Sequence, residues 1–173
     1  MKFLRILLIA IIVSSCAPIR INYDYEKTTD FTKYKTYNYY RDIETGLNEL
    51  DSKRLINAMD VKLQANGFTL SETPDFFINI QSSEFQESQR NSVGVGLGGS
   101  GRNIGGGLSI GIPIGQSKIN RQIIIDFIDE NGKGLYWQAV SESNFNPNAS
   151  PSTREEKLKA IVEKVLSQYP PQQ

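Results

Sequence analysis

The strongest constraint on the fold is a pair of long alternating stretches in the C-terminal half of the chain. Residues 119–128 place alternate apolar side chains such as Ile125 on one face of an extended segment, and residues 135–143 form a second segment of this kind. Residues 129–134 between them are dense in turn formers and include an Asn-Gly pair, a strong hairpin signal. We therefore predict a β-hairpin at this place.

Three further stretches have the two-residue period of a half-buried strand. Their apolar positions are Ile21, Tyr23 and Tyr25, then Tyr37 and Tyr39, and then Phe76, Ile78 and Ile80 within residues 75–83. Six of the eight tyrosines fall between positions 23 and 40, which suits either a platform that stacks bases or sugars or ordinary core packing. Because no basic stripe accompanies the rings, core packing is the interpretation we favour.

Two segments have the period of amphipathic helices. The first covers residues 51–66, with Asp51 or Ser52 as the cap and Gly67 after its end. The second begins at the capping box Ser152-Thr153-Arg154-Glu155, carries an apolar stripe from Leu158 to Tyr169 and ends before Pro170. Two such helices suit one face of a largely antiparallel sheet. The sequence thus predicts an α+β fold, a two-layer sandwich.

A glycine-rich stretch, residues 91–117, separates the third of these strands from the hairpin. Gly94, Gly96 and Gly99 match G-x-G-x-x-G, but no helix former follows for many residues, so we expect no nucleotide site. Apolar residues alternate with small ones on either side of residues 98–106, which predicts a second hairpin. This hairpin would extend the sheet, or it would insert into a membrane or an oligomeric barrel, since nine residues approach the ~9–11 of a transmembrane strand.

The N-terminus has the pattern of a secretory leader. Lys2 and Arg5 precede eight apolar residues, too few for a membrane-spanning helix, which needs about 20. Val13-Ser14-Ser15-Cys16 resembles the bacterial lipobox, in which the chain is cut just before a cysteine that then carries lipid. The alternative is a free or buried cysteine beside an ordinary cleavage site. We expect residues 1–15 to be a lipoprotein signal peptide, Cys16 to be acylated, residues 16–20 to form a short tether and residues 21–171 to form a single α+β domain.

The residue after the cysteine bears on location. Ala17 stands where Asp would be the familiar signal for retention at the inner membrane, so Ala17 is compatible with the outer membrane. No acidic run follows the cysteine, which favours the side that faces the periplasm. We therefore expect a lipid-anchored protein of the bacterial envelope, at the outer membrane and facing the periplasm.

Composition excludes several classes of function. With 19 basic and 19 acidic residues the chain is no general nucleic-acid binder. It has no histidine, which removes the commonest metal ligand and the usual general base, and one cysteine cannot form an intrachain disulfide. We therefore expect no metal, no cofactor and no catalytic residue. Asp126, Asp129 and Glu130 could form a carboxylate set for an envelope enzyme, but a strand followed by a turn explains them as solvated and turn-forming residues, which is the interpretation we favour.

Four short motifs carry a resemblance to a known family. They are Asp30-Phe31-Thr32-Lys33-Tyr34-Lys35-Thr36-Tyr37, Pro74-Asp75-Phe76-Phe77, Gly134-Leu135-Tyr136-Trp137 and Tyr169-Pro170-Pro171. Together they resemble the bacterial lipoprotein family built on domain of unknown function 4136, over about residues 21–171. The resemblance implies an envelope location and supplies no catalytic residue, because the family has no established activity.

The function that we predict is that of an interaction or scaffold domain. Its partners would be membrane lipid, through acylated Cys16, and an envelope protein that the sequence does not name. Two alternatives stay open. One is a component that inserts or assembles through the glycine-rich hairpin, and the other is an envelope enzyme.

Overall fold

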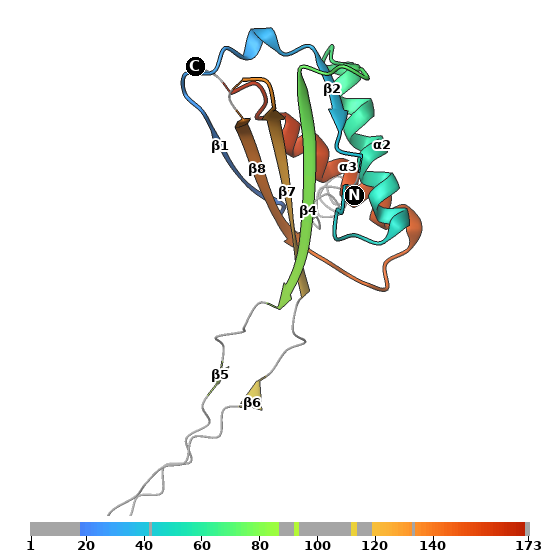
Figure 1. Cartoon of the computed structure of the whole chain (residues 1–173). Helices are drawn as coiled ribbons and strands as arrows, with labels where there is room; N and C mark the ends of the chain where they lie inside the picture. The colour runs from blue at the N-terminus through green and yellow to red at the C-terminus, as the bar shows by residue number, and fades with distance from the viewer. Residues whose placement is uncertain are drawn as a thin grey trace, which may run out of the picture.

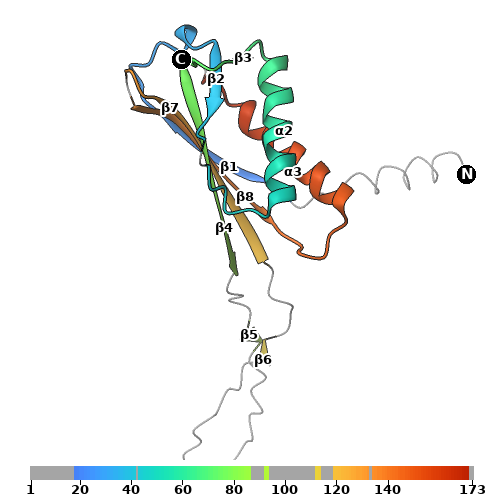
Figure 2. The same cartoon turned by 45° about the vertical axis from the view of Figure 1, so that its right-hand side comes forward.

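The computed structural model describes residues 18–41, 43–86, 119–132 and 134–171, together with the backbone of residues 92–93 and 112–113. Residues 1–15, which we predict to be a signal peptide, Cys16 and most of the glycine-rich stretch lie outside these residues. The described chain forms a six-stranded sheet with two helices on one face (Figures 1 and 2), which confirms the predicted α+β two-layer sandwich. None of the described helices is long and apolar enough to cross a membrane.

The sheet has the strand order β1-β8-β7-β4-β2-β3. Its strands are β1 (Arg20–Tyr25), β2 (Thr36–Tyr39), β3 (Thr69–Leu70), β4 (Phe76–Gln86), β7 (Ile119–Asp129) and β8 (Gly134–Asn144). A short 3-10 helix, η1 (Phe31–Lys33), precedes β2, and the two long helices are α2 (Glu49–Ala65) and α3 (Pro151–Leu166). The predicted hairpin is confirmed as β7 and β8, which pair antiparallel.

Two pairings depart from the antiparallel pattern. β2 pairs parallel with β3, and it also pairs parallel with β4, with Tyr37 opposite Phe76. The reason is the crossover between β2 and β4: α2 carries the chain back along the sheet, so that β4 starts at the same end as β2. Alternation of apolar residues is the same in both orientations, and the sequence pattern therefore did not predict this pairing.

The core fills the space between the sheet and the helices. Alternate residues of β4 and β7, among them Ile80 and Phe127, are buried there, as predicted. Tyr34 and Tyr37 are also buried, which supports core packing as the role of the tyrosine-rich stretch. Tyr23 is the contrary case, because it lies on the edge strand β1 and is 45% exposed.

Both helices begin earlier than their sequence signals indicate. The N-cap of α2 is Asn48, whose Oδ1 accepts from the backbone N–H of Asp51 at 2.9 Å, so the predicted caps Asp51 and Ser52 are wrong. The N-cap of α3 is Ser150 and not the capping-box serine. Pro151 explains this shift, because its fixed φ and missing N–H suit the first position of a helix.

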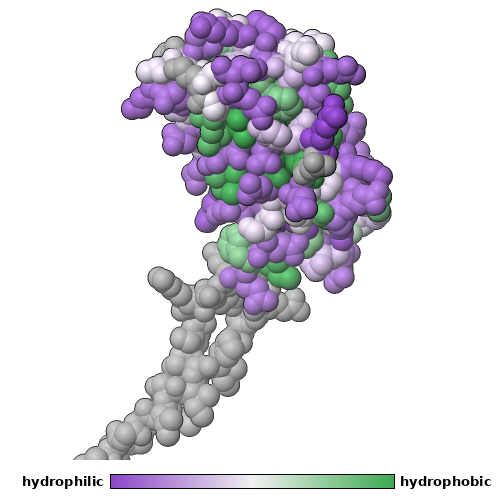
Figure 3. Space-filling model, in the orientation of Figure 1, coloured by the Kyte–Doolittle hydropathy of each residue, from purple (hydrophilic) through white to green (hydrophobic). Residues whose placement is uncertain are grey.

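The face of the sheet away from the helices is uncovered in the described part of the chain. Figure 3 looks onto this face and shows apolar patches among hydrophilic side chains. Ile124 and Val140 are half-buried there, and the Asp126 carboxylate accepts from Gln138 Nε2 at 2.7 Å and from Asn79 Nδ2 at 3.4 Å. The open face is therefore an ordinary mixed surface.

The glycine-rich stretch contributes two short strands beyond the end of this sheet. β5 (Ser92–Val93) and β6 (Ile112–Pro113) pair antiparallel, as the predicted hairpin requires at these two positions, and residues 94–111 between them lie outside the described residues. Five residues separate Gln86 from Ser92, and five separate Pro113 from Ile119, so the β5–β6 ladder keeps the register of the β4–β7 ladder. We call the end of the sheet where β4 ends and β7 begins the base end; Figures 1 and 2 show β5 and β6 beyond it.

Candidate functional site

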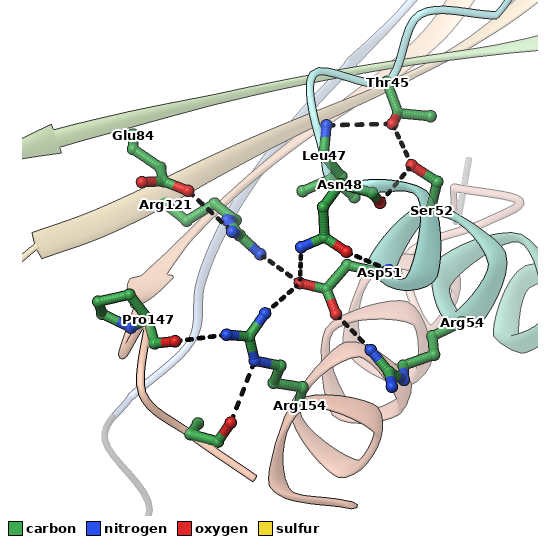
Figure 4. A network of polar contacts seen from close by, with 11 residues as sticks. Thr45, Leu47, Asn48, Asp51, Ser52, Arg54, Glu84, Arg121, Pro147 and Arg154 are labelled. Atoms are coloured by element: carbon green, nitrogen blue, oxygen red, sulfur yellow. Dashed lines mark hydrogen bonds and ion pairs between the residues drawn. The ribbon is translucent and has the colours of Figure 1, made fainter. Parts of the chain in front are cut away.

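The side chain of Asp51, in the first turn of α2, lies at the centre of a charged network (Figure 4). It is 1% exposed and faces three arginines. Arg54 of α2 donates from Nη1 to Oδ1 at 2.7 Å, and Arg154 of α3 donates from Nη1 to Oδ2 at 3.1 Å. Arg121 of β7 holds its Nη1 3.6 Å from Oδ2. One buried acid therefore connects both helices to the sheet.

Arg121 is the most deeply buried of the three cations, with a side chain 9% exposed. Its Nη2 donates to Glu84 at 2.8 Å, and its guanidinium carbon lies 3.5 Å from the centroid of the Phe145 ring. Its Nε is buried and makes no hydrogen bond within the described chain. The surrounding protein groups therefore leave one N–H of this guanidinium without an acceptor, and a buried donor without an acceptor costs free energy.

The network fixes the ionisation state of its acid. Burial of the Asp51 carboxyl acts to raise its pKa, but hydrogen bonds from Asn48 and Arg54 and the charge of Arg154 outweigh burial and hold the pKa below its usual value. Asp51 is thus a permanent anion at neutral pH. A carboxylate paired in this way orients the arginines around it.

A pocket of about 190 Å³ lies beside the network, between the end of β8, the loop after it and the first turns of α3. Its polar lining includes Asp51, Arg121, Thr153, Arg154 and Lys157, and its apolar lining includes Phe145, Leu158 and Ile161. A hollow with apolar walls and several cations at one side suits an anionic group attached to an apolar body.

The carboxylates named from the sequence have different surroundings. Asp126 is bound by Gln138 and Asn79 on the open face, whereas Asp129 accepts from the hydroxyl of Tyr34 at 3.0 Å. Glu130 is exposed in the turn. The described residues contain no group of three or more histidine, cysteine or acidic side chains that could hold a metal. Cys16, the predicted lipidation site, lies outside the described residues.

Sequence reasoning missed the network and the pocket. Asp51 has a sequence explanation as a helix cap, and Arg154 has one as part of a capping box. Arg121 offered the best available signal, because it shares the inward phase of Ile123 and Ile125 in β7. A cation in that phase must find a buried partner, but the sequence does not say which carboxylate comes near.

The fold and the network define a class: a two-layer α+β domain with a buried charged cluster where both helices meet the sheet. The chain belongs to the DUF4136 family, a domain of unknown function, since the family model matches residues 21–171. No curated protein matches the chain in sequence.

Solved structures share the fold at low identity. A PDZ domain protein from Parabacteroides distasonis is 12% identical with a TM-score of 0.59, and the match covers 95% of this chain but 39% of that protein. The chain thus spans well under half the length of that neighbour. PelC from Paraburkholderia phytofirmans, solved as a dodecamer, is 11% identical with a TM-score of 0.51, and the match covers 90% of this chain and 100% of PelC.

A third neighbour comes from the same family. It is a DUF4136 protein from Bacteroides thetaiotaomicron, 11% identical with a TM-score of 0.51, and the match covers 88% of this chain and 96% of that one. At these identities the likeness concerns the fold.

Proposed function

We propose that the protein is a lipoprotein of the bacterial envelope, in which acylated Cys16 tethers a non-catalytic interaction domain to the outer membrane on its periplasmic side. The observation that carries the proposal is the position of β1, which begins at Arg20, four residues after the lipobox cysteine. The sheet therefore starts directly after the tether. Lys164 of α3 donates to the carbonyl oxygen of Ile19 and so holds the chain just before β1 against the domain.

The polar groups of the domain support binding over catalysis. The carboxylates that could serve an enzyme have separate partners, and Asp51 is a paired anion. In contrast, β1 is an edge strand, and its outer side offers main-chain groups to a partner strand. An edge of this kind is a common place for one protein to add a strand to another.

The N-terminus of the native protein tests the tether. The full chain is produced in a two-membrane bacterium, membranes are separated by density, and the N-terminal peptide is analysed by mass spectrometry. We expect a chain that starts at acylated Cys16 in the outer-membrane fraction. Three acyl chains, each CH₂ contributing about 0.8 kcal/mol, would hold it there permanently.

Two variants sharpen this test. Cys16→Ser removes the acceptor atom and should leave the chain unacylated, while Ser15→Ala keeps a small residue before the cysteine and should leave acylation unchanged. A wild-type chain with a free Cys16 thiol, or with an uncut leader, would overturn the proposal. Crosslinking in cells should then capture an envelope protein through the domain, and capture of lipid and the chain itself alone would count against an interaction role.

A second candidate is a component that assembles through the glycine-rich hairpin. Two observations favour it: β5 and β6 continue the register of β4 and β7, and PelC, which covers a similar length, was solved as a dodecamer. Glycine on one face of a strand pair allows close approach of another backbone. In this candidate, copies of the chain associate through the hairpin at the base end.

The mass of the detergent-solubilised full chain tests assembly. We expect a closed oligomer of more than two copies, and a deletion of residues 94–111 that leaves β5 and β6 in place should reduce it to the monomer. A wild-type mass that corresponds to monomer and dimer alone would remove this candidate.

A further inference from the structure

We propose that the pocket between β8 and α3 binds the phosphate group of an anionic membrane lipid. The inference rests on the proposed function, because the lipid tether brings the domain to the membrane. It goes beyond a tether by assigning a second lipid contact, made by the folded domain itself and not by Cys16.

The charge balance of the network is the first argument. Two arginines of the network, Arg121 and Arg154, line the pocket together with one carboxylate, Asp51, so the lining carries an excess of positive charge. Glu84 is 47% exposed, and its share of the neutralisation is screened by water. The excess charge lies on Arg121 and Arg154, whose side chains are 9% and 23% exposed, and an anion is bound more strongly in such surroundings than in water.

The second argument is that the cations are held in place. Arg154 donates from Nε to the carbonyl oxygen of Ala149 at 3.2 Å and from Nη2 to that of Pro147 (Figure 4). These bonds, together with the one to Asp51, orient the guanidinium without using all of its N–H groups. Arg121 is more than nine-tenths buried and keeps an unsatisfied Nε. Preorganised guanidinium groups are the ones that proteins use for phosphate.

The walls of the pocket fit the rest of such a ligand. Phe145, Leu158 and Ile161 give it an apolar side, and Thr153 lies at the start of α3, where the helix dipole favours negative charge. A free phosphate ion has no apolar group that could contact the apolar side of the pocket. A phospholipid has such groups, because its glycerol and first methylene groups follow the phosphate.

The position of the pocket relative to the tether is the third argument. Arg20, the first residue of β1, pairs with Glu142 of β8. The next residues of β8, Ser143 and Asn144, line the pocket. The start of the domain after the tether and the pocket thus lie one or two residues apart along the sheet, at the base end. A lipid-anchored chain would hold this end near the membrane surface.

A pair of neighbouring substitutions tests the proposal. Thr153→Glu adds a negative charge to the lining of the pocket, whereas Ser152→Glu adds the same charge to the same turn of α3 outside the lining. Both residues are exposed, and both contact the Ser150 hydroxyl, so the two changes are matched in their effect on the helix. A glutamate in the first turn is also compatible with the helix dipole, and both variants should fold.

The full-length protein in neutral detergent micelles is titrated with phosphatidylglycerol, phosphatidylcholine or inorganic phosphate, and bound lipid is counted by native mass spectrometry. We expect saturable binding of phosphatidylglycerol that is weakened about tenfold by Thr153→Glu, the equivalent of one charge-assisted contact, and less than about twofold by Ser152→Glu. Phosphatidylcholine should bind more weakly than phosphatidylglycerol, because its headgroup carries a compensating cation.

Three results would overturn the inference. The first is equal binding of the two lipids, and the second is an equal loss in the two variants, which would indicate a diffuse charge effect. The third is inorganic phosphate binding as tightly as phosphatidylglycerol, which would assign the pocket to the free ion. Acylation of Cys16 is read from the mass of the same sample, so an acylated chain without lipid preference contradicts this inference and leaves the proposed function standing.

Discussion

At the scale of single residues, Asp51 has two roles that come from different parts of the structure. Its backbone N–H takes part in the N-cap of α2, and its position near the helix N-terminus suits a negative charge. Its carboxylate is bound by arginines from α2 and α3 and lies near a third from β7. The residue is therefore both a local helix signal and the central contact between the layers.

Replacement of Asp51 by asparagine tests the second role. Asp51→Asn keeps the size of the side chain but leaves three guanidinium groups without their central charge, and we expect a loss of about 3–5 kcal/mol in the free energy of unfolding. Urea denaturation followed by circular dichroism measures it. Glu49→Gln is the matched control, since Glu49 lies in the same turn and pairs with Lys53 at the surface; a similar loss in both variants would contradict a buried network.

The lowered pKa of Asp51 makes a prediction about pH. Its pKa in the folded state lies below that of the unfolded chain, about 4, so the unfolded state binds protons first. The stabilisation from Asp51 is therefore complete above pH ~4 and is lost as pH falls through the folded pKa. We expect the wild type to lose more stability between pH 6 and pH 3 than Asp51→Asn, in urea titrations at each pH. Equal pH slopes would show that Asp51 is not held as an anion. Asp75, whose pKa is also lowered, is present in both the wild type and Asp51→Asn, so its contribution is the same in the two proteins.

At the scale of elements, two glycines with positive φ differ in what surrounds them. Gly46, in the loop before α2, has φ of 71°, and a Cβ there would lie 2.4 Å from the backbone oxygen of Ser82 in β4. Gly67, after α2, has φ of 91° with open space around it. The first position serves a close approach between a loop and a strand, while the second serves the end of a helix.

The two glycines therefore predict different costs for the same substitution. Gly67→Ala should cost about 1–2 kcal/mol, the penalty of a left-handed conformation for an L-residue. Gly46→Ala adds a clash with β4 and should cost about 1–3 kcal/mol more, since backbone atoms cannot move aside easily. Thermal and urea unfolding of the two variants compare them directly. Equal costs would mean that the loop moves freely away from the sheet.

At the scale of the whole molecule, Tyr169 closes the core after the last helix. Its ring centroid lies 4.8 Å from that of Phe127, 5.1 Å from that of Trp137 and 5.8 Å from that of Phe31. Its hydroxyl lies 3.1 Å from the hydroxyl of Tyr136. One residue near the C-terminus thus connects the central hairpin with the segment that follows β1.

Substitutions of Tyr169 should affect the entire domain. Tyr169→Ala is expected to cost about 3–5 kcal/mol, because it leaves a cavity among aromatic rings. Tyr169→Phe keeps the ring and should cost about 1 kcal/mol for the lost hydrogen bond. Tyr23→Ala, on the exposed edge strand, is the control and should change little. Amide hydrogen exchange would show whether the loss extends across β7 and β8; a loss confined to the C-terminal residues would contradict a global role.

The sequence by itself determined the elements and their class. Apolar residues at two- and four-residue spacing define which face of each strand or helix avoids water, and this local property predicted β7, β8 and the stripe of α3 correctly. Helix starts were less accurate, because several polar residues before each helix could act as the cap. In α3, the position of Pro151 decided in favour of Ser150.

The tertiary structure alone decided which distant residues meet. The parallel pairing of β2 with β4 depends on the crossover through α2. The alternation of apolar and polar residues along a strand does not reveal whether its neighbour runs parallel or antiparallel, so the sequence pattern could not predict this pairing. Asp51, Arg121 and Arg154 are far apart in the chain, and each has a separate local explanation. Their contact arises because both helices pack on the same face of the sheet, and burial then requires the charges to pair.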